Sequence, residues 1–274
     1  MLVTRFAPSP TGYLHRGHAF SALSAHNAAR AAQGRFLLRI EDIDATRCRP
    51  GYEAAIFEDL AWLGLSWETP VRRQSDHLVD NQTALARLAA EGLLYRCFRT
   101  RKEVALAMTS APHGPLEVFR GEPLSQDQEA RRLAAGEPFA WRLSLDAAKR
   151  RLDGFDGLTF TDNGGCIAAQ PELGGDVILA RKDVGVAYHL AVVVDDALQG
   201  VDTVIRGRDL FEATDVHRLL QALLNLPIPA YRHHPLLLDP NGRRLAKRDG
   251  AETLRSLRER GMSAADLRKE LGFG

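Results

Sequence analysis

The chain has 274 residues, of which 45% are hydrophobic and 26% are charged, enough for one large hydrophobic core or two modest ones. Its formal net charge of +1 excludes a uniformly basic nucleic-acid coat, so any RNA-binding surface has to be a local patch. No stretch is long and apolar enough to cross a membrane, and the N-terminal residues show no signal-peptide pattern.

The first part of the chain alternates between strand-like and helix-like stretches. Short apolar runs predict strands at residues 3–6 and 36–40, and periodic stretches predict helices at about 19–32, 52–63 and 78–91. Gly64-Leu65-Ser66-Trp67 is interpreted as the break between the last two helices. This alternation is typical of parallel βαβ units and predicts an α/β protein with a Rossmann-like sheet.

The composition changes between about residue 94 and residue 184, where glycine and proline cluster and short strands and turns are predicted. We interpret this part as an inserted connective subdomain. The sheet is expected to resume with strands at 187–194 and 203–206, a helix at 212–224 and a strand at 234–238. The predicted organisation is therefore 1–93 and 185–240 for the two halves of the Rossmann-like domain, 94–184 for the insert, and 241–274 for a loop with a short helical end.

A compact motif connects the first strand with the first helix. Two prolines and Gly12 follow the strand and suit a tight turn, and helical sequence follows Gly17. A strand, a turn and a helix N-terminus favour a bound phosphate through backbone N–H groups and the helix dipole. His15 and His18 lie three residues apart, so both imidazoles would share a helix face and could donate to a phosphate. Taken alone, the pair fits a solvated helix start or a metal pair equally well.

A basic segment lies near the other end of the chain. Residues 239–242 have turn chemistry, and Arg243, Arg244, Lys247 and Arg248 follow as four cations on a short loop. Such a loop suits a triphosphate, because its contacts can tighten as charge moves during reaction. Taken alone, the segment would be interpreted as a solvated basic loop or a nonspecific RNA-binding patch in preference to a triphosphate site. The two segments together predict one nucleotide site.

Together these segments resemble a known family. Residues 6–12 with His15-Arg16-Gly17-His18 are similar to the "HIGH" region of class I aminoacyl-tRNA synthetases, in the form used by glutamyl-tRNA synthetases. Arg244-Leu245-Ala246-Lys247-Arg248 is similar to their "KMSKS" loop, with Ala246 in place of the usual serine. Three further segments match in the family's order, namely 39–44 (RIEDID), 188–196 (YHLAVVVDD) and 204–209 (VIRGRD). The resemblance extends from Met1 to about residue 260.

The resemblance implies a Rossmann-like class I synthetase catalytic domain with an inserted connective subdomain and a short helical C-terminal extension. The catalytic groups that it implies are His15, His18 and Lys247, and the implied ATP contacts are Pro8, Gly17, His18, Arg244, Leu245 and Lys247. The implied glutamate contacts are Arg5 and Arg206 for the carboxylates, Tyr188 as a neutral donor, Glu41 for the ammonium group and Ser9 as a nearby hydroxyl. Without the resemblance, Arg5 and Glu41 would be interpreted as an internal salt bridge and Tyr188 as a packed strand residue.

The chain ends soon after the segment similar to the "KMSKS" loop, so we expect no anticodon-binding domain. It therefore resembles the branch of the family that activates glutamate with ATP and attaches it to queuosine in the anticodon of tRNA(Asp). The resemblance implies a tRNA-modifying ligase whose partners are glutamate, ATP with Mg²⁺ and queuosine-containing tRNA(Asp), acting as a cytoplasmic monomer. Two alternatives stay open: glutamylation of a tRNA 3′ end or a small acceptor, and a non-catalytic RNA-binding relative.

The cysteines bear on metal binding. Many relatives hold zinc in the connective region with a Cys-x-Cys pair and a later Tyr and Cys. This chain has Cys97 but Arg99 at the second cysteine of the pair, and Phe119 at the position of a later ligand. One thiolate cannot supply the four ligands of structural zinc, so no metal site is predicted. The odd, scattered set of Cys48, Cys97 and Cys166 also predicts no disulfide framework, as expected in a reducing cytoplasm.

Overall fold

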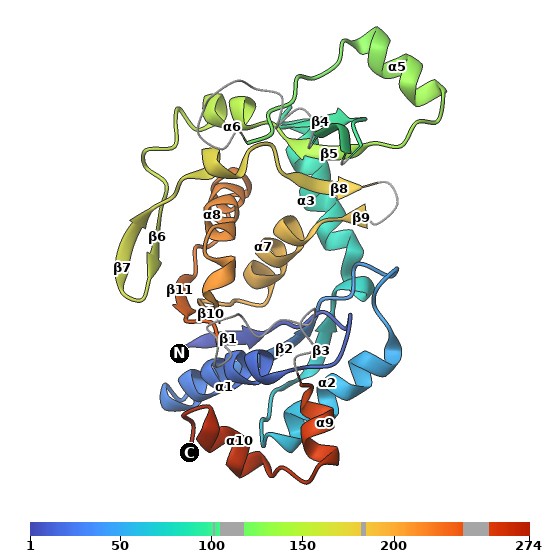
Figure 1. Cartoon of the computed structure of the whole chain (residues 1–274). Helices are drawn as coiled ribbons and strands as arrows, with labels where there is room; N and C mark the ends of the chain where they lie inside the picture. Colours follow the sequence, from blue (N-terminus) through green and yellow to red (C-terminus); the bar gives the residue numbers. More distant parts are fainter. Residues whose placement is uncertain (101, 105–117, 182–184, 238–251) are drawn as a thin grey trace.

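A parallel sheet forms the base of the fold (Figure 1). The computed structural model describes residues 1–100, 102–104, 118–181, 185–237 and 252–274. The strands β1 (Val3–Phe6), β2 (Arg35–Ile40) and β3 (Glu68–Arg73) pair in parallel, with Val3 opposite Arg35. The helices α1 (Arg16–Ala31) and α2 (Pro50–Trp62) form the connections between them. The predicted βαβ units are therefore confirmed.

A second parallel pair lies beside β1. The strands β10 (Thr203–Gly207) and β11 (Ala230–His234) pair in parallel and are connected by η3 (Arg208–Leu210) and α8 (Ala213–Leu224). Asp202, just before β10, donates its backbone N–H to the carbonyl of Val3 at 3.0 Å, and its carboxylate accepts the N–H of Val3 at 3.1 Å. These hydrogen bonds place β10 beside β1, so the parallel sheets β3-β2-β1 and β10-β11 lie edge to edge, which confirms the Rossmann-like α/β class.

The sheet separates two hydrophobic cores, because successive side chains of a strand point to opposite faces. Leu37 of β2 joins the core beneath α3 (Leu78–Ala90), α7 (Tyr188–Leu198) and α8, whereas Phe36 and Leu38 join the core beneath α1 and α2. The terminal helices α9 (Leu254–Glu259) and α10 (Ala264–Glu270) cover the second core with buried leucines. They lie beside α1 and α2 (Figure 1), so the predicted short helical end is part of the packed domain. None of the helices in the described ranges is long and apolar enough to span a bilayer.

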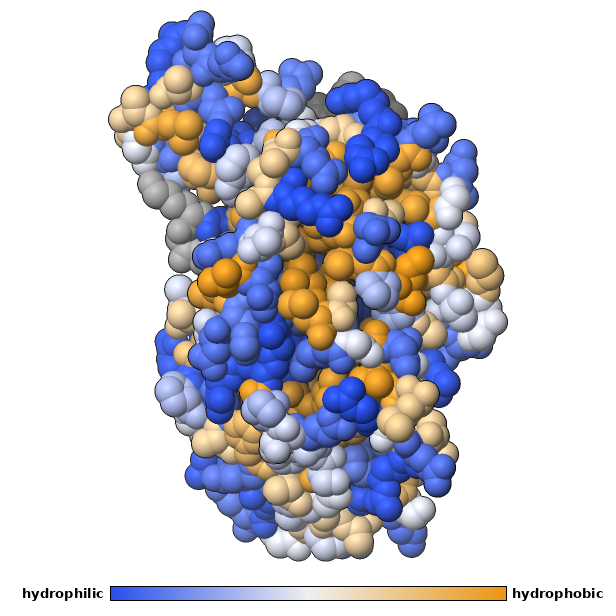
Figure 2. Space-filling model, turned by 180° about the vertical axis from the view of Figure 1, so that it is seen from behind, coloured by the Kyte–Doolittle hydropathy of each residue, from blue (hydrophilic) through white to orange (hydrophobic). Residues whose placement is uncertain are grey.

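The insert forms a layer at the end of the molecule away from α9 and α10 (Figure 1). The strands β4 (Leu94–Cys97), β5 (Ala140–Leu143), β8 (Ile178–Arg181) and β9 (Gly185–Val186) form an antiparallel sheet. The helix α6 (Leu145–Arg151) buries Leu145 and Ala148, whereas α5 (Gln126–Ala134) buries no residue. Figure 2 shows α5 as a separate lobe with hydrophilic residues over most of it.

One hairpin of the insert returns to the main sheet. It consists of β6 (Thr159–Asp162) and β7 (Gly165–Ala168), and Asp162 pairs in parallel with Tyr231 of β11. The remaining short elements are the single turns η1 (Gln74–His77) and η2 (Pro171–Gly174). The hairpin gives residues 94–184 a direct contact with β11 that their sequence did not predict.

Residues 187–194 do not form the predicted strand, because Tyr188–Leu198 is the helix α7. Every residue from Leu190 to Asp196 is buried, since α7 is enclosed by other helices and by the sheet. A helix that is apolar on all sides lacks the polar stripe that marks an amphipathic helix. A short run of valines in such a position cannot be told from a buried strand by periodicity.

One further strand prediction is corrected, and one strand was not predicted. The strand expected at 234–238 lies at Ala230–His234, and residue 238 is outside the described residues. The apolar run after Pro235 was mistaken for the strand, whereas the true strand buries Tyr231 and His233 between more exposed neighbours. The strand β3 was not predicted, because its residues are exposed or half-buried and include Pro70, so they show no apolar alternation.

Candidate active site

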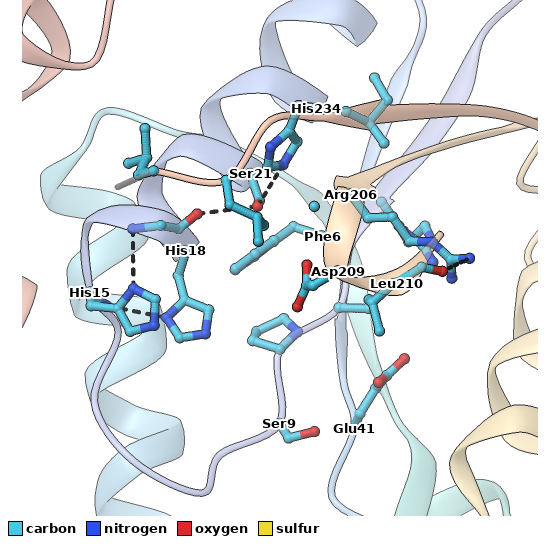
Figure 3. Close-up of a pocket in the computed structure, with 18 of the residues that line it drawn as sticks. Phe6, Ser9, His15, His18, Ser21, Glu41, Arg206, Asp209, Leu210 and His234 are labelled. Carbon is cyan, nitrogen blue, oxygen red and sulfur yellow. Dashed lines mark hydrogen bonds between the residues drawn. The ribbon is translucent and has the colours of Figure 1, made fainter. Parts of the chain in front are cut away.

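A pocket of about 320 Å³ opens at the carboxyl ends of β1 and β10, beside the start of α1. Its walls include all five predicted glutamate contacts and four residues predicted for the ATP side, namely Arg5, Ser9, Glu41, Tyr188, Arg206, Pro8, His15, Gly17 and His18. In Figure 3, His15 and His18 lie on one side of the pocket and Glu41 and Arg206 on the other. Open α/β sheets bind ligands in this kind of crevice, outside the carboxyl ends of the strands.

The two histidines close the N-terminus of α1. The Nδ1 atom of His15 accepts the N–H of Gly17 at 3.1 Å, and the Nδ1 atom of His18 accepts the N–H of His15 at 3.2 Å. This reciprocal capping box orients both rings, whose centroids lie 3.8 Å apart. Because each Nδ1 accepts, a neutral ring carries its hydrogen on Nε2, the atom that could donate to a phosphate. The local sequence therefore places both predicted catalytic imidazoles at a helix N-terminus.

The segment similar to the "KMSKS" loop lies outside the described residues, and with it Arg244, Leu245, Ala246 and Lys247. The described residues that flank this segment reach the pocket region. Leu237 lines the pocket on one side, and Thr253 forms an isolated β-bridge with His15 on the other. The chain thus departs from and returns to the neighbourhood of the two histidines.

Buried charges form the opposite wall. Arg5 donates from Nε to Oδ1 of Asp196 at 2.9 Å and from Nη2 to Oδ2 at 3.3 Å. Arg39 is fully buried and donates to Asp196 at 2.8 Å and to Glu41 at 3.2 Å. The internal salt bridge of Arg5 is therefore with Asp196 and not with Glu41. Sequence reasoning missed Arg39 and Asp196, although both lie in segments that carried the family resemblance.

This network sets the protonation of its carboxyl groups. Burial raises the pKa of Glu41, and the attraction of Arg39 and Arg5 opposes that shift. Burial also disfavours the charged form of Asp196, but Arg5 and Arg39 outweigh this cost and lower the pKa of Asp196. Asp196 is therefore a carboxylate at neutral pH. An ammonium group placed beside Glu41 would stabilise its charged form.

Arg206 and Tyr188 complete this wall. Arg206 extends from β10, is 5% exposed, and donates to the carbonyl of Leu210 at 3.0 Å and to the hydroxyl of Thr214 at 2.8 Å. Tyr188 starts α7, and burial raises the pKa of its phenol, so the hydroxyl stays neutral. Tyr188 is therefore a helix residue and not the strand residue that the sequence suggested.

Sequence reasoning missed several residues of the pocket. The hydroxyl of Ser21 lies 2.8 Å from Nε2 of His234, and this contact joins α1 to the end of β11. Asp209 also lines the pocket and lies between the histidine side and Arg206 in Figure 3. Ser21 follows His18 by three residues, which places both on one helix face, so the spacing could have identified it.

A second cavity, of about 510 Å³, adjoins the first. The two share Ser9, Thr11, Glu41 and Tyr188 in their walls. The rest of the second cavity is lined by the segment after β2 and by β8 and β9 of the insert. Glu41 and Tyr188 therefore face both the pocket and a neighbouring space large enough for a second ligand.

An apolar cluster occupies the region that corresponds to the zinc site implied by the family resemblance. Cys97, Phe119 and Tyr95 are buried together, and the guanidinium of Arg142 lies 4.3 Å from the centre of the Phe119 ring. All three cysteines are free thiols. Among the residues that the structure describes, no cluster of three or more His, Cys, Asp or Glu residues could hold a metal ion. That the protein binds no zinc stays a prediction.

Comparisons with known proteins agree with this geometry. The family model for the catalytic domain of class I tRNA synthetases (E and Q) matches residues 1–271. A glutamyl-Q tRNA(Asp) synthetase from Rhodobacter capsulatus is 48% identical over 280 residues, which cover 99% of this chain and 100% of that protein. A glutamate–tRNA ligase from a Synechococcus species is 37% identical over 277 residues, which cover 97% of this chain and 57% of that protein.

A solved structure shows the same fold. The glutamate-tRNA synthetase from Elizabethkingia anophelis superimposes with a TM-score of 0.77 at 27% identity, covering 91% of this chain and 53% of that protein. This chain thus spans about half the length of the solved synthetase. The fold and the pocket define the catalytic domain of a class I aminoacyl-tRNA synthetase. The chain belongs to the class I tRNA synthetases for glutamate and glutamine, which confirms the predicted family.

Proposed function

We propose that this protein activates glutamate with ATP and transfers it to queuosine in the anticodon of tRNA(Asp). Similarity to the Rhodobacter capsulatus synthetase along the full length of that protein supports this choice. The observation that carries the proposal is a single pocket that Arg5 lines and that has Arg206 and Glu41 on one side and the two histidines of α1 on the other. One side fits a charged amino acid, and the other fits phosphate.

The amino-acid side has the charges that glutamate requires. Glutamate carries two carboxylates and one ammonium group, and guanidinium groups bind carboxylates through paired, charge-assisted hydrogen bonds. Arg5 and Arg206 supply two such groups, and Glu41 supplies a carboxylate for the ammonium group. Tyr188 and Ser9 add neutral hydroxyls to the lining of the pocket. We therefore assign these five residues to glutamate binding.

The phosphate side suits formation of an acyl adenylate. An oxygen of the α-carboxylate of glutamate forms a bond to the α-phosphorus of ATP, and the bond from that phosphorus to the bridging oxygen of pyrophosphate breaks. His15 and His18 would donate from Nε2 to the phosphate oxygens, and the N-terminus of α1 favours the added negative charge. We assign Lys247 to the leaving pyrophosphate, which departs with Mg²⁺. Positioning and charge stabilisation supply most of the catalysis, so no protein nucleophile is needed.

The acceptor would approach from the second cavity. A hydroxyl of queuosine attacks the activated carbonyl carbon, the bond from that carbon to the phosphate oxygen breaks, and AMP leaves while the hydroxyl proton passes to its phosphate or to water. The second cavity shares Glu41 and Tyr188 with the glutamate side, so a nucleoside there would face the activated carboxylate. We further propose that the protein acts as a monomer on cytoplasmic tRNA.

Incubation with glutamate, ATP and queuosine-containing tRNA(Asp), followed by nuclease digestion and mass spectrometry, tests the proposal. The queuosine nucleoside should gain the mass of one glutamyl group, and matched tRNA(Asp) with guanosine at that position should accept none. Unchanged queuosine beside an acylated terminal adenosine would instead assign the activity to the 3′ end. No incorporation and no glutamate-dependent ATP–pyrophosphate exchange would indicate a non-catalytic relative.

A further inference from the structure

A buried polar cluster fixes the guanidinium of Arg206. Nε donates to Nε2 of His233 at 3.1 Å, and Nη1 lies 3.3 Å from Nδ1 of His217. Nη2 donates to the carbonyl of Leu210 and to the hydroxyl of Thr214. A guanidinium has five N–H donors, and these contacts with described residues engage four of them. One hydrogen on Nη1 is left for a ligand in the pocket that Arg206 lines.

Arg206 dictates the tautomers of both imidazoles, because a guanidinium can only donate. His233 must accept at Nε2 and carry its hydrogen on Nδ1, which lies 2.9 Å from Oδ1 of Asp162. His217 must accept at Nδ1, so its Nε2 hydrogen faces Nδ1 of His189 at 3.2 Å. Burial and the charge of Arg206 lower the pKa of both His233 and His217, which favours the neutral rings that this arrangement needs.

Asp162 belongs to the hairpin that the insert sends to the main sheet. It ends β6, lies opposite Tyr231 of β11, and accepts the backbone N–H of His233 at 3.0 Å as well as its ring hydrogen. The side chains of His233 and Asp162 are 0% and 8% exposed. The other tautomer of His233 would set a bare nitrogen against the carboxylate and an N–H against the Nε–H of Arg206. Both contacts would be repulsive in a buried site.

We propose that Asp162 and His233 are positioning residues that orient Arg206 toward a carboxylate of glutamate. Asp162 keeps the hydrogen of His233 on Nδ1, and the bare Nε2 then holds the Nε–H of Arg206 so that Nη1 faces the ligand. This inference rests on the proposed function, since it takes Arg206 as a glutamate contact. It gives the insert, through β6, a direct part in recognition of the amino acid.

Glutamate-dependent ATP–pyrophosphate exchange of three variants tests the pair. His233→Leu removes the acceptor, His233→Gln keeps a side-chain oxygen that can accept, and Asp162→Asn keeps the shape without the charge. In His233→Leu the KM for glutamate should rise about 10- to 100-fold, as for loss of one hydrogen bond to a charged group, and the KM for ATP should change less than about twofold. In His233→Gln the KM for glutamate should stay close to the wild-type value. In Asp162→Asn it should lie between the values of the two His233 variants.

Asp215→Asn is the matched control. Asp215 of α8 accepts the backbone N–H of Gln170 at 2.9 Å, so it also ties the insert to the main domain through one carboxylate, but it does not contact Arg206. Its variant should lower the thermal unfolding temperature without raising the KM for glutamate. If His233→Leu raised both Michaelis constants equally, or neither, the positioning role would be wrong.

Proton–nitrogen correlation spectra of the imidazole rings decide the tautomer without an activity measurement. The wild-type protein should show His233 with its hydrogen on Nδ1, and the signal is assigned by its loss in His233→Gln. An Nε2–H tautomer would overturn the inference. A wild-type protein without glutamate-dependent exchange would overturn the proposed function, while the spectra would still report on the pair. The two failures are therefore distinguishable.

Discussion

The two sides of the pocket are built differently. On the glutamate side, Arg5, Arg39 and Asp196 are buried and joined by hydrogen bonds between elements far apart in the chain. On the phosphate side, His15 and His18 are half-buried, and backbone N–H groups at the start of α1 orient their rings. The first arrangement depends on tertiary structure, whereas the second depends on a local capping motif.

This difference suits two chemical tasks. Recognition of a charged amino acid is strongest when the protein charges are fixed before binding, because ordering them afterwards would reduce affinity. Phosphate chemistry needs donors aimed at charge that develops in the transition state. Changes on the glutamate side should therefore affect folding and glutamate binding, whereas changes on the phosphate side should affect rate.

Arg39→Met should have the largest effect. It removes one of the two arginine partners of Asp196 and the partner of Glu41 in a buried site, so the free energy of unfolding should fall by about 3–5 kcal/mol. Urea denaturation measures this change. The control, Arg35→Met, is on the same strand as Arg39. It removes an exposed ion pair with Glu68 of β3 and should leave stability nearly unchanged. Equal losses in the two variants would contradict the special role of the buried network.

His18→Ala should have the next largest effect, and it should act on the rate of glutamate activation. Loss of one donor to the transition state should slow ATP–pyrophosphate exchange about 10²–10³-fold, with little change in the KM for glutamate. His77→Ala, at an exposed position in η1, is the control and should exchange at the wild-type rate. A raised KM for glutamate with an unaltered turnover in His18→Ala would erase the contrast between the two sides.

Acid pH should lower the free energy of unfolding through His189, which lies on the glutamate side. Burial and Arg206 lower the pKa of His189 to about 4, whereas an unfolded histidine titrates near 6.5. Below pH 6.5 the unfolded chain binds a proton that the folded ring does not, so stability falls as the pH falls toward 4. From pH 7 to pH 5 the wild type should lose about 1–2 kcal/mol more than His189→Gln. Urea titrations at both pH values measure this difference, and parallel losses would mean that His189 is not held neutral.

Glu252→Gln should have the smallest effect. Glu252 lies just before α9 and pairs with Arg16 at the start of α1 at 2.7 Å and with Arg260, and all three side chains are partly exposed. Loss of these pairs should lower the free energy of unfolding by less than about 1 kcal/mol and leave the KM for glutamate unchanged. Chemical denaturation and exchange kinetics of the same preparation check both statements. A larger loss would show that the phosphate side also relies on long-range charge pairs.

Local chemistry made part of the molecule predictable. The run from Val3 to His18 contains a strand, a proline turn and a helix start, and each follows from residues next to it in sequence. The segment that became α7 was predicted wrongly, since its burial on all sides comes from partners elsewhere in the chain. Arg39 was likewise overlooked, because two of its three charged partners, Asp195 and Asp196, are brought to it from α7 by folding.

The sequence by itself determined the family, the Rossmann-like class and about half of the residues that line the pocket, because short motifs with defined spacing carry that information. Only the tertiary structure decided how those residues are held. The carboxylates of Asp162 and Asp196 meet His233 and Arg5 across separations of 71 and 191 residues. Such pairs have no local signature, since the free energy that brings them together comes from burying the helices and strands that carry them.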